Sequence, residues 1–336
     1  MTKIGLDVMW WDKIIWKISW AEERLIAWLN TLKISPEMEL FLFWNKELIL
    51  SLLHNKKVKW KLDIVDVQSW KEIETLTKII KKWEIEWWVS AWDTWELIKE
   101  SLRLWRLIFN KTRFSPALTA YMPKEGWWQT MILDLWASSS WFKSPEDMIE
   151  AYLNNAMLAI ANYMAHWQWN PKLGIFNIWV EEYKWPKPLQ EVYKLFKEKY
   201  WDSFVWNIEW DKIFTTEADI IVTDWFTWNM VLKAVEWTVK LLRKEVKQCI
   251  KKHNIAVLLA LWLAPFLRDI KIKYNPDKYA GSPVLWVDRN FFKSHWSSNA
   301  EAIKNALIKC HNFAKQWDLY RIKDNLWKLT ENKNEQ

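Results

Sequence analysis

Short apolar runs recur along the chain and alternate with longer segments in which apolar residues return every three to four positions. The short runs predict strands, and the wider spacing predicts helices that bury one face. The predicted strands are residues 3–9, 40–43, 62–67, 85–90, 117–122, 131–135, 173–178, 204–208 and 219–223, and the predicted helices are residues 22–29, 94–108, 145–164 and 188–199. Because the strand runs are almost continuously apolar, we expect an α/β fold with a mostly parallel sheet and helices on both faces.

Residues 229–273 interrupt this alternation. A long helix is predicted over residues 229–253, and the apolar run at 255–267 that follows it is too short to cross a bilayer. This protrusion is either buried in the core or a dimer contact, or it contacts an acyl chain or a membrane surface. Residues 317–336 are polar and charged, so we expect a tail that frays after a single α/β domain over residues 1–316.

The chain contains 33 tryptophans and four glycines among its 336 residues, although glycine averages about 7% of protein residues. Many of these tryptophans stand where a predicted strand runs into a turn, as in residues 7–12, 90–95, 133–137 and 223–229. Such turns favour glycine, which tolerates positive φ and lets a ligand reach backbone N–H groups. We therefore hypothesise that the source reads one codon, UGA, as glycine. Sugar-stacking or membrane-interface tryptophans are the alternatives, but neither predicts tryptophan at turn after turn.

The charge of the chain favours acidic partners. Its 48 basic and 41 acidic residues give a formal net charge of +7 and a pI near 9.1, which suits phosphorylated ligands, acidic carrier proteins or anionic lipid surfaces. The basic residues are dispersed and no RNA-recognition, zinc-finger or helix-turn-helix signature occurs, which argues against nucleic acid. Neither the two cysteines nor the five histidines show metal-ligand spacing, and the first residues do not resemble a signal peptide, so we expect a cytoplasmic protein.

Six short motifs become recognisable when tryptophan is read as glycine. They are D-x-M-G-G-D at residues 7–12, S-A-G-D-T-G at 90–95, L-D-L-G-A at 133–137, F-N-I-G at 176–179, T-D-G-F-T-G-N at 223–229 and K-S-H-G-S-S at 293–298. Their order and spacing over residues 3–316 resemble the bacterial acyl-acyl-carrier-protein:phosphate acyltransferase family. The chain departs from the family at Asp93 and Ser138, where the family usually has asparagine.

The resemblance implies a three-layer α/β/α fold like that of isocitrate and isopropylmalate dehydrogenases, a homodimer, and peripheral contact with the inner membrane surface. It also implies that orthophosphate attacks the thioester of acyl-acyl-carrier protein, giving acyl phosphate for phospholipid synthesis without metal, nucleotide or other cofactor. A downstream glycerol-phosphate acyltransferase would use that product. Two alternatives remain: a phosphotransacetylase-like enzyme that uses coenzyme A thioesters, and a non-catalytic membrane-surface adaptor for acyl-carrier protein.

Phosphate is a competent nucleophile and a thiolate is a fair leaving group, so such a protein mainly positions two anionic reactants and stabilises an oxyanion. The strand end and helix start at residues 224–229 are the sharpest candidate for a phosphate site, because helix N-termini bind anions. On this interpretation Asn229 and Thr227 donate hydrogen bonds to phosphate and Asp224 orients the loop. The alternative is that Asp224 and Asn229 only cap the helix.

Two further motifs carry candidate chemistry. Lys184 supplies positive charge to the phosphate and Asn177 fixes its loop, unless Lys184 is an ordinary surface lysine. His295 polarises the thioester carbonyl or protonates the departing sulfur, although a lone histidine is more often structural. Ser297 and Ser298 are either phosphate donors or helix caps.

The first two motifs add carboxylate and hydroxyl groups. Asp7 and Asp12 bracket the first tryptophan pair, and because no third ligand accompanies them we expect hydrogen bonds that brace the loop rather than a metal site. Ser90 and Thr94 are candidate hydroxyl donors at the second loop, where Thr94 also suits the start of the following helix.

Overall fold

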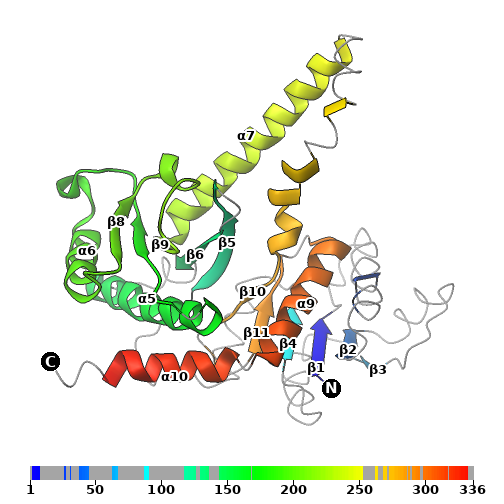
Figure 1. The fold of residues 1–336 in the computed structure, drawn as a ribbon, viewed down its shortest axis with the longest axis horizontal. Coiled ribbons are helices and arrows are strands. Elements are labelled where there is room, and N and C mark those ends of the chain that lie inside the picture. The colour runs from blue at the N-terminus through cyan, green and yellow to red at the C-terminus, as the bar shows by residue number, and fades with distance from the viewer. Residues whose placement is uncertain are drawn as a thin grey trace. The chain divides into compact units, whose positions relative to one another are not determined.

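The structure is a computed structural model, drawn in Figure 1. It forms two compact units, each with a sheet of its own. Unit 1 comprises Met1–Ala120, Asn154–Asn170 and Pro276–Gln336, and unit 2 comprises Tyr121–Leu153 and Pro171–Asn275. The structure describes residues 2–7, 26–27, 31, 38–44, 63–66, 87–90, 117–125, 129–135, 144–167, 169–252, 262–263, 268–270, 272–285, 287, 290–295, 298–316 and 318–331.

The sheet of unit 1 has the strand order β10-β11-β4-β1-β2-β3. Its strands are β1 (Thr2–Asp7), β2 (Met38–Trp44), β3 (Asp63–Asp66), β4 (Trp87–Ser90), β10 (Ser282–Pro283) and β11 (Asn290–Lys293). The pairs β1–β2, β1–β4, β2–β3 and β4–β11 are parallel, whereas β10–β11 is antiparallel. Asp7, Ser90 and Lys293, the last residues of β1, β4 and β11, therefore lie along one carboxyl edge of this sheet.

Helix α9 (Ala300–Lys315) packs on this sheet, where it contacts β1, β4 and β11 (Figure 1). Its first turn is capped by Asn299, whose side-chain oxygen accepts a hydrogen bond of 2.9 Å from the backbone N–H of Ala302. Ile303 and Leu307, one helical turn apart, are fully buried and anchor the helix. A short 3-10 helix, η5 (Pro276–Tyr279), contacts α9 as well.

Part of the segment predicted as a polar tail forms helix α10 (Asp318–Glu331), which contacts α9. Ile322 and Leu326, spaced four residues apart, are buried, while Trp327 is 63% exposed. The Asn325 side chain donates a hydrogen bond of 3.1 Å to the carbonyl oxygen of Ala161. The segment is thus amphipathic, with an apolar stripe too narrow to stand out among its many charges.

Unit 2 is built on a second sheet with the order β5-β6-β9-β7-β8. Its strands are β5 (Leu118–Pro123), β6 (Gln129–Leu135), β7 (Leu173–Phe176), β8 (Phe204–Ile208) and β9 (Ile220–Asp224). The pairs β6–β9, β7–β9 and β7–β8 are parallel. All residues of β7 and most of β9 are buried, as expected for strands covered on both faces.

The helices of unit 2 begin where sequence rules place them. Helix α5 (Pro145–Trp167) follows Ser144, whose hydroxyl accepts a hydrogen bond of 3.2 Å from the backbone N–H of Asp147. Helix α6 (Lys187–Lys199) contacts β8 and buries Val192 and Phe196 on one face. The short helices η3 (Glu182–Lys184) and η4 (Trp210–Lys212) lie in loops after β7 and β8.

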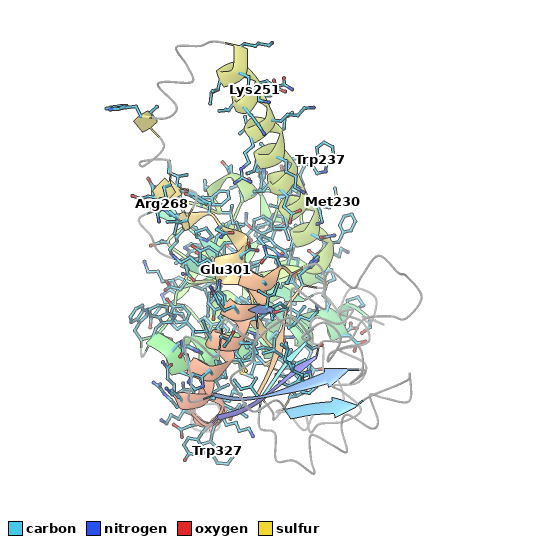
Figure 2. The ribbon with its side chains drawn as sticks, turned by 90° about the vertical axis from the view of Figure 1, so that its right-hand side faces the viewer. Met230, Trp237, Lys251, Arg268, Glu301 and Trp327 are labelled. Carbon is cyan, nitrogen blue, oxygen red and sulfur yellow. The ribbon has the colours of Figure 1, made fainter. Side chains whose placement is uncertain are left out.

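Helix α7 (Trp225–Lys252) begins directly after β9 and contacts β6 and β9 at its start (Figure 1). Its later turns extend beyond the sheet of unit 2. Figure 2 shows Met230, Trp237 and Lys251 following one another along this helix. No helix within the described residues is long and apolar enough to cross a membrane.

The α/β class predicted from the alternation of strands and helices is confirmed. Each of the nine strands described before residue 225 overlaps a predicted run, including β7, β8 and β9. The predicted helix at 94–108 lies outside the described residues, as does nearly all of the one at 22–29. The predicted domain limits stay a prediction.

Candidate functional site

The carboxyl edge of the unit 2 sheet gathers most of the predicted phosphate-site residues. In the parallel pair β7–β9, Ile175 stands opposite Val222. Asn177 and Asp224 each lie two residues further along the chain, at the carboxyl ends of these two neighbouring strands. Ligands of open α/β sheets bind at this edge, which makes the position suitable for a substrate site.

Asp224 ends β9 and caps helix α7. Its Oδ1 accepts a hydrogen bond of 2.9 Å from the backbone N–H of Thr227, three residues into the turn. The capping role considered as an alternative for Asp224 is therefore observed. The first N–H groups of a helix have no partner within it, so those of residues 225 and 226 remain suited to an anion. Thr227 and Asn229 lie half-buried in the first two turns.

Asn177 presents a buried hydrogen-bond donor at the same edge. Its side chain is only 6% exposed, and its Oδ1 accepts a hydrogen bond of 2.8 Å from the backbone N–H of Ile178. Its backbone N–H donates to the carbonyl oxygen of Ile208 at 3.1 Å, which holds the strand end in place. The Nδ2 group has no hydrogen-bond partner among the described residues. An oxygen of a bound anion would satisfy this donor.

Lys184 lies in the loop that follows Asn177, at the end of η3. Its ammonium group donates a hydrogen bond of 2.8 Å to Glu181 and lies 4.8 Å from the centre of the Trp179 ring. That hydrogen bond from Lys184 is the main cause of a lowered pKa of the Glu181 carboxyl. The pair is largely exposed, so it is weak and a competing anion can displace it. The structure places Lys184 on the surface of unit 2.

The remaining described candidates belong to unit 1. Ser90 is fully buried at the end of β4, and the backbone N–H of Ser294 donates to its carbonyl oxygen at 2.7 Å. His295 is exposed, and its carbonyl oxygen accepts a hydrogen bond of 3.0 Å from the backbone N–H of Ser298. Helix α9 is capped by the next residue, Asn299, rather than by Ser298.

Three candidates, Asp12, Thr94 and Ser297, lie outside the described residues. Asp7 ends β1 beside Phe43, and only its backbone is described. Within unit 2 the structure brings Asn177, Asp224 and the start of α7 to one edge, and within unit 1 it brings Ser90 next to residues 293–295. No group of His, Cys, Asp and Glu among the described residues is arranged to hold a metal ion.

Sequence reasoning missed Lys293 and Ser294, although it singled out the motif that contains them. Both are buried, with exposed fractions of 6% and 2%. In the sequence, a lysine followed by a serine is typical of a polar turn. No local pattern indicates that both side chains are buried. The two phenylalanines directly before this lysine, Phe291 and Phe292, were the available signal of a buried strand.

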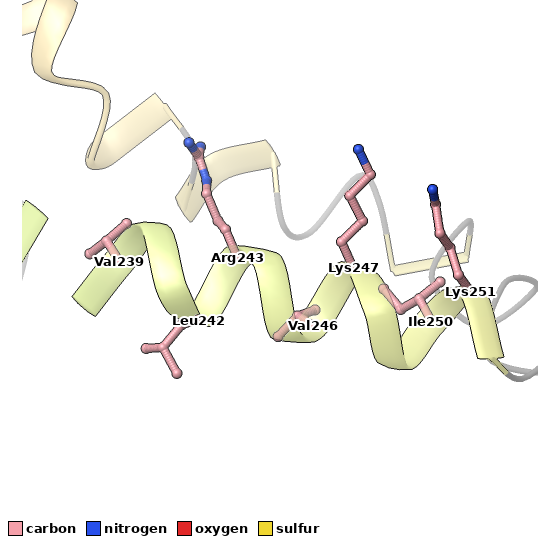
Figure 3. Close-up of a pocket in the computed structure, with 7 residues that line it drawn as sticks. All are labelled: Val239, Leu242, Arg243, Val246, Lys247, Ile250 and Lys251. Carbon is pink, nitrogen blue, oxygen red and sulfur yellow. The ribbon is translucent and has the colours of Figure 1, made fainter. Parts of the chain in front are cut away.

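A groove runs along the outer part of α7 (Figure 3). The side chains of Arg243, Lys247 and Lys251 extend to one side of the helix, and Leu242 extends to the other. The groove is lined by Val239, Leu242, Arg243, Val246, Lys247, Ile250 and Lys251. The outer half of α7 is therefore both apolar and basic on its surface.

The fold belongs to the α/β class, with polar groups at the carboxyl ends of its parallel strands. Among solved structures, a branched-chain phosphotransacylase from Enterococcus faecalis matches with a TM-score of 0.52, at 11% identity over 94% of this chain and 100% of that one. At so low an identity the likeness shows the fold alone.

Sequence comparison identifies the family. Residues 64–317 match the fatty acid synthesis protein family, and the chain belongs to it. A phosphate acyltransferase from Dictyoglomus turgidum is 30% identical over 256 residues, covering 76% of this chain and 74% of the relative. A phosphate acyltransferase from Thermosipho africanus is 32% identical over 162 residues, so the match spans 48% of this chain and about half of that relative, 50%.

Proposed function

We propose that this protein transfers a fatty acyl group from acyl-carrier protein to orthophosphate, giving acyl phosphate for phospholipid synthesis. A phosphate oxygen attacks the thioester carbonyl carbon, a C–O bond forms and the C–S bond breaks. The proton carried by hydrogen phosphate ends on the departing thiol, so the products are acyl phosphate and free carrier protein. The matching relatives are named phosphate acyltransferases, which supports this reaction.

The observation that carries the proposal is the carboxyl edge of the unit 2 sheet. There the Nδ2 donor of Asn177 has no partner among the described residues, and Asp224 on the neighbouring strand caps a 28-residue helix. We place phosphate against this donor and the first N–H groups of α7, with Thr227 and Asn229 as additional donors. The helix dipole favours an anion at this end. Lys184 reaches the phosphate after leaving Glu181, and His295 passes the proton of hydrogen phosphate to the departing sulfur.

The test is phosphate-dependent release of free carrier-protein thiol from acyl-acyl-carrier protein, with no added metal or nucleotide. We expect acyl phosphate to accumulate in step with the thiol. The Asn177→Ala variant should raise KM for phosphate, whereas Asn305→Ala, a half-buried asparagine of helix α9, should not. Transfer from coenzyme A thioesters but not from carrier protein would favour the phosphotransacetylase-like alternative. Binding of carrier protein without any transfer would favour the adaptor.

We further propose the three-layer α/β/α arrangement of the dehydrogenase-like fold and a homodimer. Helix α7 supports the dimer because it exposes large apolar side chains, among them Met230 (60%), Trp237 (73%) and Leu242 (58%). Sedimentation at several concentrations tests this, with Leu242→Lys expected to weaken association. A monomer at every concentration would contradict it.

Peripheral contact with an anionic membrane surface is proposed from the same helix. Seven basic and two acidic residues lie between Trp225 and Lys252, and Arg243, Lys247 and Lys251 extend together in Figure 3. Each basic residue near an anionic surface contributes about 1 kcal/mol. Sedimentation with anionic vesicles should carry the protein down, and replacing these three residues with glutamine should abolish it. Equal binding to neutral vesicles would contradict the proposal.

We also propose that the natively made protein carries glycine at many of its tryptophan positions. Trp206 has a φ of 67°, the one positive value of a non-glycine residue within the described chain. Trp179, Trp201 and Trp210 lie in turns or a short 3-10 helix and are 47%, 64% and 61% exposed. Glycine suits each of these places. The intact mass of protein from the native host tests this, and a mass that equals the 41.1 kDa of the written chain would refute it.

A further inference from the structure

A separate polar cluster lies at the carboxyl edge of the unit 1 sheet. Lys293 ends β11 and stands opposite Ser90, which ends β4, in parallel register. Ser294 follows, and its backbone N–H donates a hydrogen bond of 2.7 Å to the carbonyl oxygen of Ser90. Backbone hydrogen bonding between β4 and β11 therefore continues one residue beyond the last paired residues of the two strands. Ser90, Lys293 and Ser294 are 0%, 6% and 2% exposed.

The Ser294 hydroxyl is the unusual group of this cluster. Its Oγ is buried and has no hydrogen-bond partner among the described residues. Most buried polar side-chain atoms in folded proteins are hydrogen-bonded, because leaving one unpaired destabilises the fold. A bound ligand that forms a hydrogen bond with this hydroxyl explains why a serine occupies this strand end.

Lys293 places a positive charge beside this hydroxyl. Its ammonium group donates a hydrogen bond to the carbonyl oxygen of Ser294. Lysine is rarely buried to this degree. A buried ammonium next to an unpaired hydroxyl donor complements a negatively charged oxygen, because hydrogen bonds to charged acceptors are stronger and less screened in such a place.

We propose that Lys293 and Ser294 bind a negatively charged oxygen of the substrates. This inference rests on the proposed acyl transfer, in which two such oxygens exist. One is an oxygen of orthophosphate, and the other is the thioester carbonyl oxygen, which becomes negative when the C–O bond has formed and before the C–S bond breaks. The Ser294 hydroxyl and the Lys293 ammonium pair with one of them, and the protein forms no covalent bond in this step.

The decisive variant is Ser294→Ala. We expect the rate of acyl transfer to fall at least about tenfold, as for loss of one oxyanion donor. The stability against urea should stay equal or rise, since the lost hydroxyl has no hydrogen-bond partner among the described residues. Ser294→Thr keeps a hydroxyl and should restore part of the rate. Ser203→Ala, at a half-buried serine whose hydroxyl bonds the carbonyl oxygen of Tyr200, is the matched control and should keep the full rate.

Lys293→Met tests the charge, with Lys323→Met on the exposed face of α10 as its control. A raised KM for phosphate in the Lys293 and Ser294 variants assigns the phosphate oxygen. A lowered kcat at unchanged KM assigns the thioester oxygen. Either result supports the proposal.

Full activity in Ser294→Ala and Lys293→Met, when the unaltered chain is active, overturns this inference and leaves acyl transfer intact. Unfolding of Ser294→Ala also overturns it, because the hydroxyl would then serve the fold. Absence of transfer by the unaltered chain would instead contradict the proposed function. In that case, equal binding of inorganic phosphate by the unaltered chain and Ser294→Ala would count against the inference as well.

Discussion

The carboxylate of Asp224 accepts a hydrogen bond of 2.9 Å from the backbone N–H of Thr227, so the last residue of β9 is also the capping residue of α7. One side chain thereby links the end of a buried parallel strand to the start of the longest helix described. Because the cap uses one of the first N–H groups of the helix and leaves others unused, capping and anion binding are compatible at this site.

Asp224→Ala should lower the free energy of unfolding by about 1 kcal/mol, the usual effect of removing an N-cap. Urea denaturation measures this. Asp224→Asn keeps an oxygen acceptor and should retain most of the stability. If Asp224→Asn is as unstable as Asp224→Ala, then the negative charge rather than the hydrogen bond to Thr227 stabilises the helix start.

Asn177→Asp should weaken phosphate binding more than Asn177→Ala does. The alanine variant only removes the Nδ2 donor, whereas the aspartate variant puts a carboxylate oxygen in its place and repels the anion. We expect KM for phosphate to rise about tenfold or more in Asn177→Asp. A tenfold rise corresponds to a loss of about 1.4 kcal/mol of binding free energy. Equal KM values in the two variants would place the phosphate elsewhere.

Many of the strands and helices of unit 2 could be predicted from the amino-acid sequence. The buried strands β7 and β9 are continuous apolar runs, and α5 carries its start signal in Ser144 and Pro145. These features depend on local composition, which the sequence displays directly. Helix α10 was harder to predict. Its buried residues Ile322 and Leu326 are surrounded by charged residues in the sequence, and the helix packs against α9.

The candidate site could be predicted only in part. Strand ends were identified, so Asn177 and Asp224 were named, and the parallel pairing of β7 and β9 puts both at the same edge of the sheet. The burial of Lys293 and the unpaired hydroxyl of Ser294 depend on how β11 pairs with β4, a contact between residues about 200 positions apart. No local pattern carries that information.

Lys309 should make stability depend on pH. Burial lowers the pKa of its ammonium from 10.5 to about 8, and the group donates a hydrogen bond of 2.9 Å to the carbonyl oxygen of Gly281. Between these two pKa values the unfolded chain binds more protons than the folded one, so the free energy of unfolding should rise as pH increases from about 8 to 10.5.

Lys309→Met should remove this rise, which urea titrations at several pH values would reveal. Lys323→Met, at an exposed lysine, should keep it. A rise of equal size in Lys309→Met would assign the pH dependence to another group.

Trp206 provides a test of the glycine hypothesis within the chain itself. Its φ of 67° lies in the left-handed region, which costs residues with a Cβ roughly 1–2 kcal/mol. We therefore expect Trp206→Gly to be more stable than Trp206→Ala by about 1 kcal/mol, measured by urea denaturation. Comparing these two variants isolates the backbone, because both remove the ring contacts with Tyr193 and Phe204. At Trp237, in the interior of α7, the order should reverse, since glycine is the poorer helix former. Greater stability of the alanine variant at position 206 would mean that this position of β8 does not require glycine.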